Sequence, residues 1–289
     1  MNFHRGSNPY VGQVSLKVQQ LERSLTFYKE AIGFSVLKQT ETTADLTADG
    51  KTVLLSLEQP DNVIPTPRKT TGLYHFALLL PTRSDLANYV RHFAELGLRI
   101  GSSDHLVSEA LYLSDPDGNG IEIYRDRNPS EWTWRNGQVE MAVDPLDFRD
   151  LLSHEEEKPW TGLPADTVMG HIHLHVSELQ TTEKFYSKGL GFEVVNRFGA
   201  QALFISSGKY HHHIGLNTWN GVGAPKPPEN SAGLKSFTLI YPDEAARNRV
   251  VANLGQMNFN VHQEGSGSIA TTDPSGNRIL LLVREEISI

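Results

Sequence analysis

The chain has 289 residues, of which 38% are hydrophobic and 21% charged, and its net charge is −8. The acidic balance and the lack of a basic tract argue against a nucleic-acid partner. No apolar run reaches the roughly 20 residues of a membrane span, and the first residues carry no apolar signal segment, so we expect a cytoplasmic protein. No cysteine is present. Any transition-metal site must therefore use histidine and carboxylate ligands.

The first predicted unit is a strand followed by a helix, and it recurs in the second half of the chain. The segment from Gly12 reads GQVSLKVQQLERSLTFYKEAIGF, and the segment from Gly170 reads GHIHLHVSELQTTEKFYSKGLGF. In both segments a strand-like alternation precedes apolar residues at helical spacing. We expect each helix to end at a glycine, Gly33 or Gly191, in a left-handed C-cap.

A second pair of segments repeats at nearly the same offset. GLYHFALLL from Gly72 matches GLKSFTLIY from Gly233, and a helical segment follows each. A turn and a strand then close each unit, with the sequences DPDGNGIEIY from Asp115 and DPSGNRILLL from Asp273. Self-similarity at a fixed offset indicates duplicated structural units.

The two repeats divide the chain into four βαβββ modules of the α+β class. The predicted modules cover residues 11–59, 72–126, 169–218 and 233–285. The first two fill residues 1–126, and the last two fill residues 169–289. Residues 127–168 form a connector, which contains Trp132 and Trp134. Its aromatic content predicts a folded segment rather than a disordered tether.

This modular sequence resembles the vicinal oxygen chelate superfamily, which includes glyoxalase I, bleomycin-resistance proteins and type I extradiol dioxygenases. The resemblance covers the whole chain except the connector. It implies that the modules pair into two cup-shaped half-barrels of strands. It also implies that metal ligands come from the first strand of each module and from the last strand of one.

The ligand positions of that family indicate one metal site in this chain. The first-strand positions hold Gln13, His75, His171 and Ser236, and the last-strand positions hold Glu122 and Leu280. Only the second and third modules together supply two histidines and a carboxylate, namely His75, His171 and Glu122. Pairing in chain order would give Gln13 with His75 and Glu122, and an amide is a poor ligand beside imidazole. We therefore expect the second and third modules to form the active cup.

The segment from His105 to Glu122 resembles the extradiol dioxygenase signature. It reads HLVSEALYLSDPDGNGIE. The resemblance assigns Glu122 to the metal and gives His105 and Tyr112 catalytic roles beside it. Ser103, two residues before the histidine, departs from the residues that the signature prefers. The corresponding positions of the fourth module hold Gln263, Ala270 and Leu280, so all three chemical groups are missing there.

Three consecutive histidines, His211 to His213, stand near the end of the third module. The family places an acid–base histidine at this point, where it can take a proton from a catechol. Strand alternation sends His211 and His213 to one face and His212 to the other. We prefer His213 for this role, and His212 takes it if a β-bulge exchanges the faces.

The resemblance implies an oxidoreductase, a catechol 2,3-dioxygenase-like extradiol enzyme of aromatic catabolism that opens catechol-type rings with O2. Two histidines and one carboxylate leave coordination positions open on Fe(II) for a catechol and for O2, and Mn(II) accepts the same ligands. A glyoxalase-type lyase or transferase and a non-catalytic binding or resistance protein stay as alternatives. The third module offers no acid for the fourth ligand that glyoxalase-type members use, which favours the dioxygenase. A homo-oligomer is left open.

Overall fold

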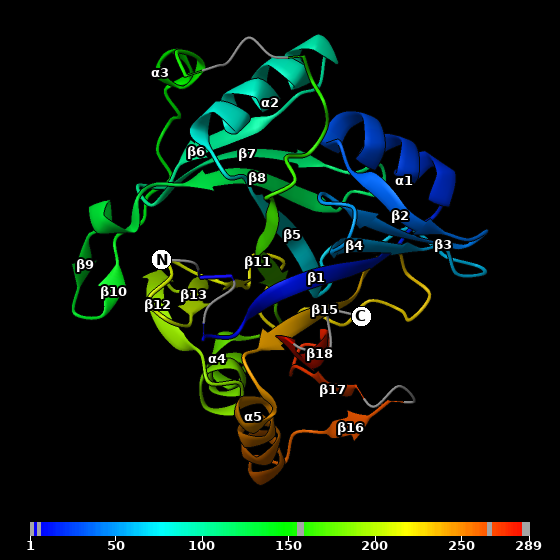
Figure 1. The fold of residues 1–289 in the computed structure, drawn as a ribbon. Helices are drawn as coiled ribbons and strands as arrows, with labels where there is room; N and C mark the ends of the chain where they lie inside the picture. Colours follow the sequence, from blue (N-terminus) through cyan, green and yellow to red (C-terminus); the bar gives the residue numbers. More distant parts are fainter. Residues whose placement is uncertain (1–2, 5–6, 155–158, 265–267, 285–289) are drawn as a thin grey trace.

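Two curled eight-stranded sheets dominate the computed structural model, which describes residues 3–4, 7–154, 159–264 and 268–284 (Figure 1). The first sheet has the strand order β16-β17-β18-β15-β1-β4-β3-β2. The second has the order β12-β13-β14-β11-β5-β8-β7-β6. An antiparallel pair stands at the centre of each sheet, β1 with β15 and β5 with β11. Residues 155–158 of the predicted connector lie outside the described residues.

The first sheet combines strands from the two ends of the chain. Its strands are β1 (Tyr10–Lys17), β2 (Ser35–Gln39), β3 (Thr43–Thr47), β4 (Val53–Glu58), β15 (Gly233–Tyr241), β16 (Val261–Gln263), β17 (Ile269–Thr272) and β18 (Arg278–Val283). The accompanying helices are α1 (Leu21–Phe27), which continues as a π-helical turn (Tyr28–Ile32), and α5 (Glu244–Gln256). The strands expected in the first and fourth modules thus lie side by side.

The second sheet is built from the middle of the chain. Its strands are β5 (Gly72–Leu79), β6 (Gly101–Asp104), β7 (Ser108–Ser114), β8 (Gly120–Asp126), β11 (Val168–His175), β12 (Glu193–Phe198), β13 (Ala202–Ser206) and β14 (Ile214–Asn217). The accompanying helices are α2 (Arg83–Glu95) and α4 (Leu179–Lys184), which continues as a π-helical turn (Phe185–Gly189). The predicted fold class, βαβββ modules paired into two half-barrels, is confirmed.

The connector between β8 and β11 carries short elements of its own. They are a 3-10 turn (Pro129–Glu131), the strands β9 (Trp134–Arg135) and β10 (Gln138–Val139), and α3 (Phe148–Leu152). Trp132 and Val139 are buried in a small apolar cluster with Phe3 and Tyr210. This part of the connector therefore packs against the N-terminal segment and the turn before β14.

Local sequence signals explain where several helices begin and end. Thr82 caps α2, because its hydroxyl accepts the backbone N–H of Asp85 at 3.1 Å and the Asp85 carboxylate accepts the backbone N–H of Thr82 at 3.1 Å. Gly33 and Gly191 follow the helices of the first and third modules with φ angles of 86° and 81°. Both glycines thus adopt the left-handed conformation predicted for C-caps.

The two Asp-Pro turns connect neighbouring modules through buried tyrosines. The Asp115 carboxylate accepts the backbone N–H of Asn119 at 2.8 Å and the hydroxyl of Tyr28 at 2.9 Å. In the other half of the chain, the Asp273 carboxylate accepts the hydroxyl of Tyr186 at 3.0 Å. Each turn stands directly before the last strand of its module. The first turn therefore fixes the start of β8, which carries Glu122.

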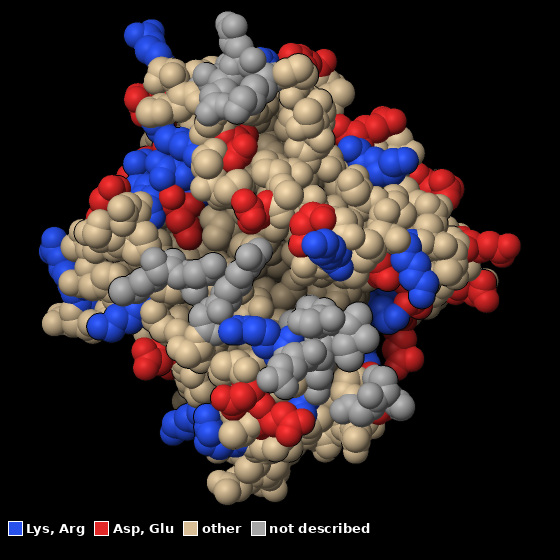
Figure 2. All heavy atoms as spheres, in the orientation of Figure 1, with Lys and Arg blue, Asp and Glu red and all other residues tan. Residues whose placement is uncertain are grey.

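The interior and the surface are those of a folded globular protein. One large apolar cluster extends through both sheets, from Val11 of β1 to Leu281 of β18. Acidic and basic side chains are interspersed over the face drawn in Figure 2. Within the described ranges, no helix combines the length and apolar character needed to cross a bilayer.

Candidate metal centre

Three neighbouring strands bring the predicted ligand residues together. His75 lies on β5, His171 on the antiparallel neighbour β11, and Glu122 on β8, which runs parallel to β5. The Nε2 atoms of His75 and His171 lie 3.0 and 3.1 Å from Oε2 of Glu122. One donor atom from each residue lies within 4.8 Å of the other two, and all three side chains are buried.

The spacing and hydrogen bonding of this group fit a divalent metal ion. Nε2 of His75 is buried and makes no hydrogen bond, although it lies 3.0 Å from the Glu122 carboxylate. A buried polar atom without a partner is costly unless something else binds it. Ligand atoms about 2.1 Å from an ion and at right angles around it lie about 3 Å apart, which matches the observed spacing. Two imidazoles and one carboxylate form the open face that suits Fe(II) or a similar ion.

The environment of Glu122 and His171 favours the protonation states that bind a metal. Burial alone would raise the pKa of Glu122, but His171 and His75 outweigh it and hold that pKa well below its usual value. Burial lowers the pKa of His171 to about 4, and Glu122 opposes this shift only in part. Metal ligands must be deprotonated carboxylates and neutral imidazoles. At neutral pH Glu122 and His171 are therefore in the forms that bind a metal.

A cavity of about 320 Å³ opens beside the three ligand residues. His75 and Glu122 line it together with the predicted Tyr112, His105 and His212. The rest of its wall is largely apolar and aromatic, with Tyr74, Met141, Val143, Phe198, Phe204 and Trp219. Its volume lies within the range of small-molecule sites. A small molecule bound in this cavity would therefore lie directly against His75 and Glu122.

Tyr112 and His105 form a hydrogen-bonded pair in the wall of this cavity. Nε2 of His105 lies 2.6 Å from the Tyr112 hydroxyl, and Nδ1 lies 2.6 Å from the carbonyl oxygen of Ala142. A carbonyl only accepts, so Nδ1 carries the proton and Nε2 accepts the hydroxyl proton of Tyr112. Burial and the nearby Glu122 carboxylate raise the pKa of Tyr112 well above its usual value. The tyrosine therefore remains protonated beside the metal group.

The histidine triplet corrects one expectation. It precedes β14, which begins at Ile214, so the alternation of a strand does not apply to it. His212 lines the cavity, and its ring centroid lies 4.1 Å from that of His171. The ring of His213 instead packs against Tyr210, and its Nδ1 lies 3.2 Å from the hydroxyl of Ser206. The structure thus places His212 at the cavity and not the preferred His213.

Sequence reasoning missed a polar chain that lies behind His212. Nε2 of His211 lies 2.7 Å from Asp126, and its Nδ1 lies 2.8 Å from Nδ1 of His212. The Asp126 carboxylate accepts a hydrogen bond from Nε2–H of His211, and in this neutral tautomer Nδ1 of His211 accepts a hydrogen bond from Nδ1–H of His212. Burial lowers the pKa of His212 well below its usual value, so the ring is neutral, and the hydrogen bond from Nδ1 leaves Nε2 as the unprotonated nitrogen. Asp126 lies four residues after Glu122 on the same face of β8, and that spacing was the available signal.

Comparison with known proteins identifies the family of this chain. The Glyoxalase/Bleomycin resistance protein/Dioxygenase superfamily matches residues 10–123 and 168–281. The chain belongs to this superfamily. It is 46% identical over 277 residues to catechol-2,3-dioxygenase of Bacillus subtilis (strain 168), a match that covers 95% of this chain and 97% of that protein.

Two more distant members of the superfamily also match. Biphenyl-2,3-diol 1,2-dioxygenase 3 of Rhodococcus globerulus is 30% identical over 131 residues, which cover 43% of this chain and 68% of that protein. Glyoxalase I of Zea mays superposes with a TM-score of 0.59 at 15% identity, over 97% of this chain and 96% of that one. The structural match shows the shared fold.

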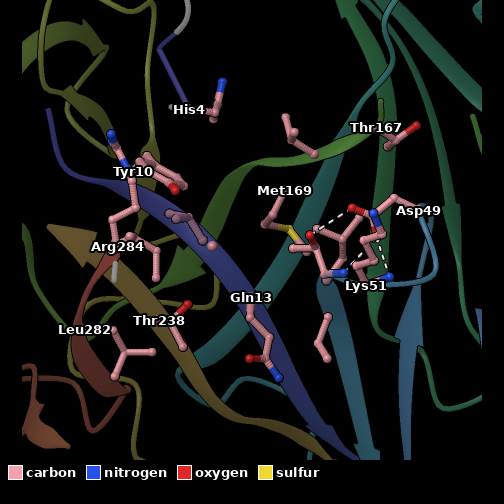
Figure 3. Close-up of a pocket in the computed structure, with 17 residues that line it drawn as sticks. His4, Tyr10, Gln13, Asp49, Lys51, Thr167, Met169, Thr238, Leu282 and Arg284 are labelled. Carbon is pink, nitrogen blue, oxygen red and sulfur yellow. Dashed lines mark hydrogen bonds between the residues drawn. The ribbon is translucent and has the colours of Figure 1, made fainter. Parts of the chain in front are cut away.

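The first sheet of this superfamily member has a pocket of different chemistry, drawn in Figure 3. This first-sheet pocket has a volume of about 710 Å³ and includes Gln13 from β1, Thr238 from β15 and Leu282 from β18. The positions that correspond to His171, His75 and Glu122 hold Gln13, Ser236 and Leu280. Among the described residues, only the group around His75 brings three metal-binding side chains together.

Proposed function

We propose that the protein is an extradiol ring-cleavage dioxygenase, which opens catechol-type aromatic rings with O2. The observation that carries the proposal is the buried group of His75, Glu122 and His171 at a cavity that also exposes Tyr112 and His212. The 46% identity to a protein named catechol-2,3-dioxygenase supports the same activity. Cleavage beside the diol would convert catechol and O2 into a muconic semialdehyde.

His75, His171 and Glu122 would hold the metal, and Fe(II) is the ion we propose. When bound, Fe(II) would supply neighbouring open positions at which the two oxygens of a catechol and O2 come together. Mn(II) accepts the same donors. The surrounding apolar wall would hold the aromatic ring and exclude bulk water.

His212 would act as the acid–base residue. His212 lines the cavity, and with its proton on Nδ1 its Nε2 can accept a proton from a catechol hydroxyl. Its Nδ1–H is held by His211, which Asp126 orients in turn. A positioned acid–base group of this kind contributes about 10²–10⁴-fold to a rate.

Tyr112 would stabilise the oxygen that becomes a carbonyl as the ring opens. Its hydroxyl remains protonated and lies beside Glu122. Its single proton is donated to His105 in this structure, so the hydroxyl would turn from His105 to donate a hydrogen bond to a substrate oxygen. His105 positions that hydroxyl through the 2.6 Å hydrogen bond. The carbonyl of Ala142 keeps His105 in the accepting tautomer.

The proposal is tested with protein that is loaded anaerobically with Fe(II) and then mixed with catechol and O2. Wild-type protein should take up about one O2 per catechol and form a yellow product, whereas His75→Ala should lose both iron and O2 uptake. His262→Gln, at an exposed histidine of β16, is the matched control and should keep both. Iron binding and ring cleavage that survive His75→Ala would refute the site. Turnover without O2 uptake would favour the glyoxalase-type alternative.

A further inference from the structure

A further pocket adjoins the active cavity, and we call it the cationic pocket. Its volume is about 400 Å³. Gly72 and Leu73 of β5, Asn119 of the first Asp-Pro turn and His175 of β11 contribute to its wall. The ring centroid of Tyr74, which lines the active cavity, lies 5.1 Å from that of His175. The Tyr74 ring thus lines the active cavity and packs against a residue of the cationic pocket.

Positive charge gathers in the cationic pocket, although the chain has a net charge of −8. Lys17, Arg68 and Lys69 line it, and no lining residue is Asp or Glu. Lys17 stands at the end of β1, and the exposed Arg68 and Lys69 lie in the segment before β5. Like charges around a small cavity repel one another and attract an anion.

Nearby carboxylates do not line this pocket. Glu58 and Glu229 lie close enough to act on the charge of Lys17. Glu58 forms an ion pair with Lys235 outside the pocket. Lys17 also donates to the backbone carbonyl of Glu229. The wall itself therefore keeps an excess of positive charge.

Hydrogen bonds from distant parts of the chain hold the pocket in shape. The side chain of Asn220 donates to the carbonyl of Thr70 at 2.8 Å, and the hydroxyl of Thr71 donates to the carbonyl of Ser275 at 2.8 Å. One buried group in the wall is unsatisfied, because Ser231 is 1% exposed and its hydroxyl has no hydrogen-bond partner. The pocket thus combines a fixed wall, positive charge and an unused polar group.

We propose that the cationic pocket binds a small oxyanion, the carboxylate or phosphate group of a small molecule. The cations of Lys17, Arg68 and Lys69 would pair with the oxyanion, and Ser231 would donate a hydrogen bond to it. This site lies beyond the proposed ring cleavage, which requires no anion there. An occupied pocket would lie on the His175 side of Tyr74.

The test measures anion binding to the intact protein. We would record its melting temperature in sodium phosphate, in sodium acetate and in sodium chloride of matched ionic strength, and determine dissociation constants by calorimetry. A ligand that binds only the native state raises the melting temperature. Phosphate or acetate should therefore raise it above the value in chloride.

Matched double variants separate a site from general charge effects. Arg68→Met with Lys69→Met should weaken anion binding by about tenfold or more, since hydrogen bonds to charged groups are the strong ones. Lys38→Met with Arg99→Met removes two exposed cations outside the pocket and should leave binding unchanged. Ser231→Ala should also weaken binding without any change of charge.

The outcomes decide both the site and its ligand. Selective stabilisation by phosphate would indicate a phosphate-bearing ligand, and selective stabilisation by acetate would indicate a carboxylate. Equal weakening in both double variants, or no rise above chloride for the wild type, would overturn the proposal. Ring cleavage does not enter these measurements, so such a failure would leave the proposed dioxygenase function untouched.

Discussion

The two sheets share one backbone plan but carry different side chains at equivalent positions. In the second sheet β5 runs parallel to β8 with Ala77 opposite Glu122, and in the first β15 runs parallel to β18 with Thr238 opposite Leu280. Both central antiparallel pairs contain two register irregularities at matching places. The strand arrangement alone therefore does not create a metal centre. The metal-binding group depends on a few side chains that differ between the two sheets.

The sheets also differ in how their pockets are filled. Tyr124 of β8 projects into the second cup, and its hydroxyl lies 2.7 Å from that of Tyr210. Leu282 takes the equivalent position in the first sheet and lines the pocket of about 710 Å³ there. A hydrogen-bonded tyrosine thus stands in the second sheet where the first sheet has a leucine beside a pocket.

Glu122→Leu should have the largest effect, because it replaces the carboxylate of the metal group with leucine, the residue at the equivalent position 280 of the first sheet. Two imidazoles alone form an incomplete site. Iron content should fall from about one per chain to less than about a tenth, and O2 uptake with catechol should fall to background. Metal analysis and an oxygen electrode provide the measurements. Leu280→Met, a volume-conserving change in the first sheet, should alter neither.

Tyr112→Phe should have the next largest effect. It removes the hydroxyl but keeps the ring, so kcat should fall by about 10²–10⁴-fold while iron content stays the same. Because His105 acts through that hydroxyl, adding His105→Ala to Tyr112→Phe should cost little more than Tyr112→Phe alone. Steady-state kinetics of both single variants and the double variant test this. Fully additive losses would show that His105 acts independently.

His212→Val should lower kcat by about 10²-fold or more, because it removes the proposed acid–base group. Valine is chosen because Val53 is the counterpart of His212 in the first sheet. His213→Gln should keep kcat within about threefold, because His213 does not line the cavity. Both variants should retain iron. If the two losses were exchanged, His213 would be the acid–base residue after all.

The repeat could be read from the sequence alone. The family resemblance then pointed to His75, Glu122 and His171, which the structure brings together. The sequence did not determine whether His212 or His213 faces the cavity. That choice depends on β14 beginning at Ile214, which leaves the triplet irregular. The role of the Ala142 carbonyl could not be predicted from the sequence either, since it depends on how the connector folds back onto His105.

Buried histidines should make the metal-free protein sensitive to acid on the side of the active cup. Burial lowers the pKa of His4 and His213 below their usual values. Below about pH 6.5 the unfolded chain then binds more protons, so stability is complete above that pH and is lost as pH falls. Each such histidine should contribute up to about 1.4 kcal/mol per pH unit. The measurement is urea unfolding from pH 7.5 to 5.

His213→Gln should flatten this pH dependence, because it removes one buried imidazole. His262→Gln, at a half-exposed imidazole of β16, should leave the dependence as in the wild type. Equal slopes in all three proteins would mean that His213 is protonated in the folded state, against the expected effect of its burial.

Thr238→Val should have the smallest effect, and in the stabilising direction. Thr238 is 3% exposed, and its hydroxyl has no hydrogen-bond partner. Its removal should raise the free energy of unfolding by about 1 kcal/mol, with iron content and kcat unchanged. Thr47→Val is the matched control, and it should destabilise, because the Thr47 hydroxyl donates to Asp49 at 2.9 Å. If Thr238→Val destabilised as well, the Thr238 hydroxyl would have a polar partner in solution. The first-sheet pocket would then bind a polar molecule and would not be merely a site without metal ligands.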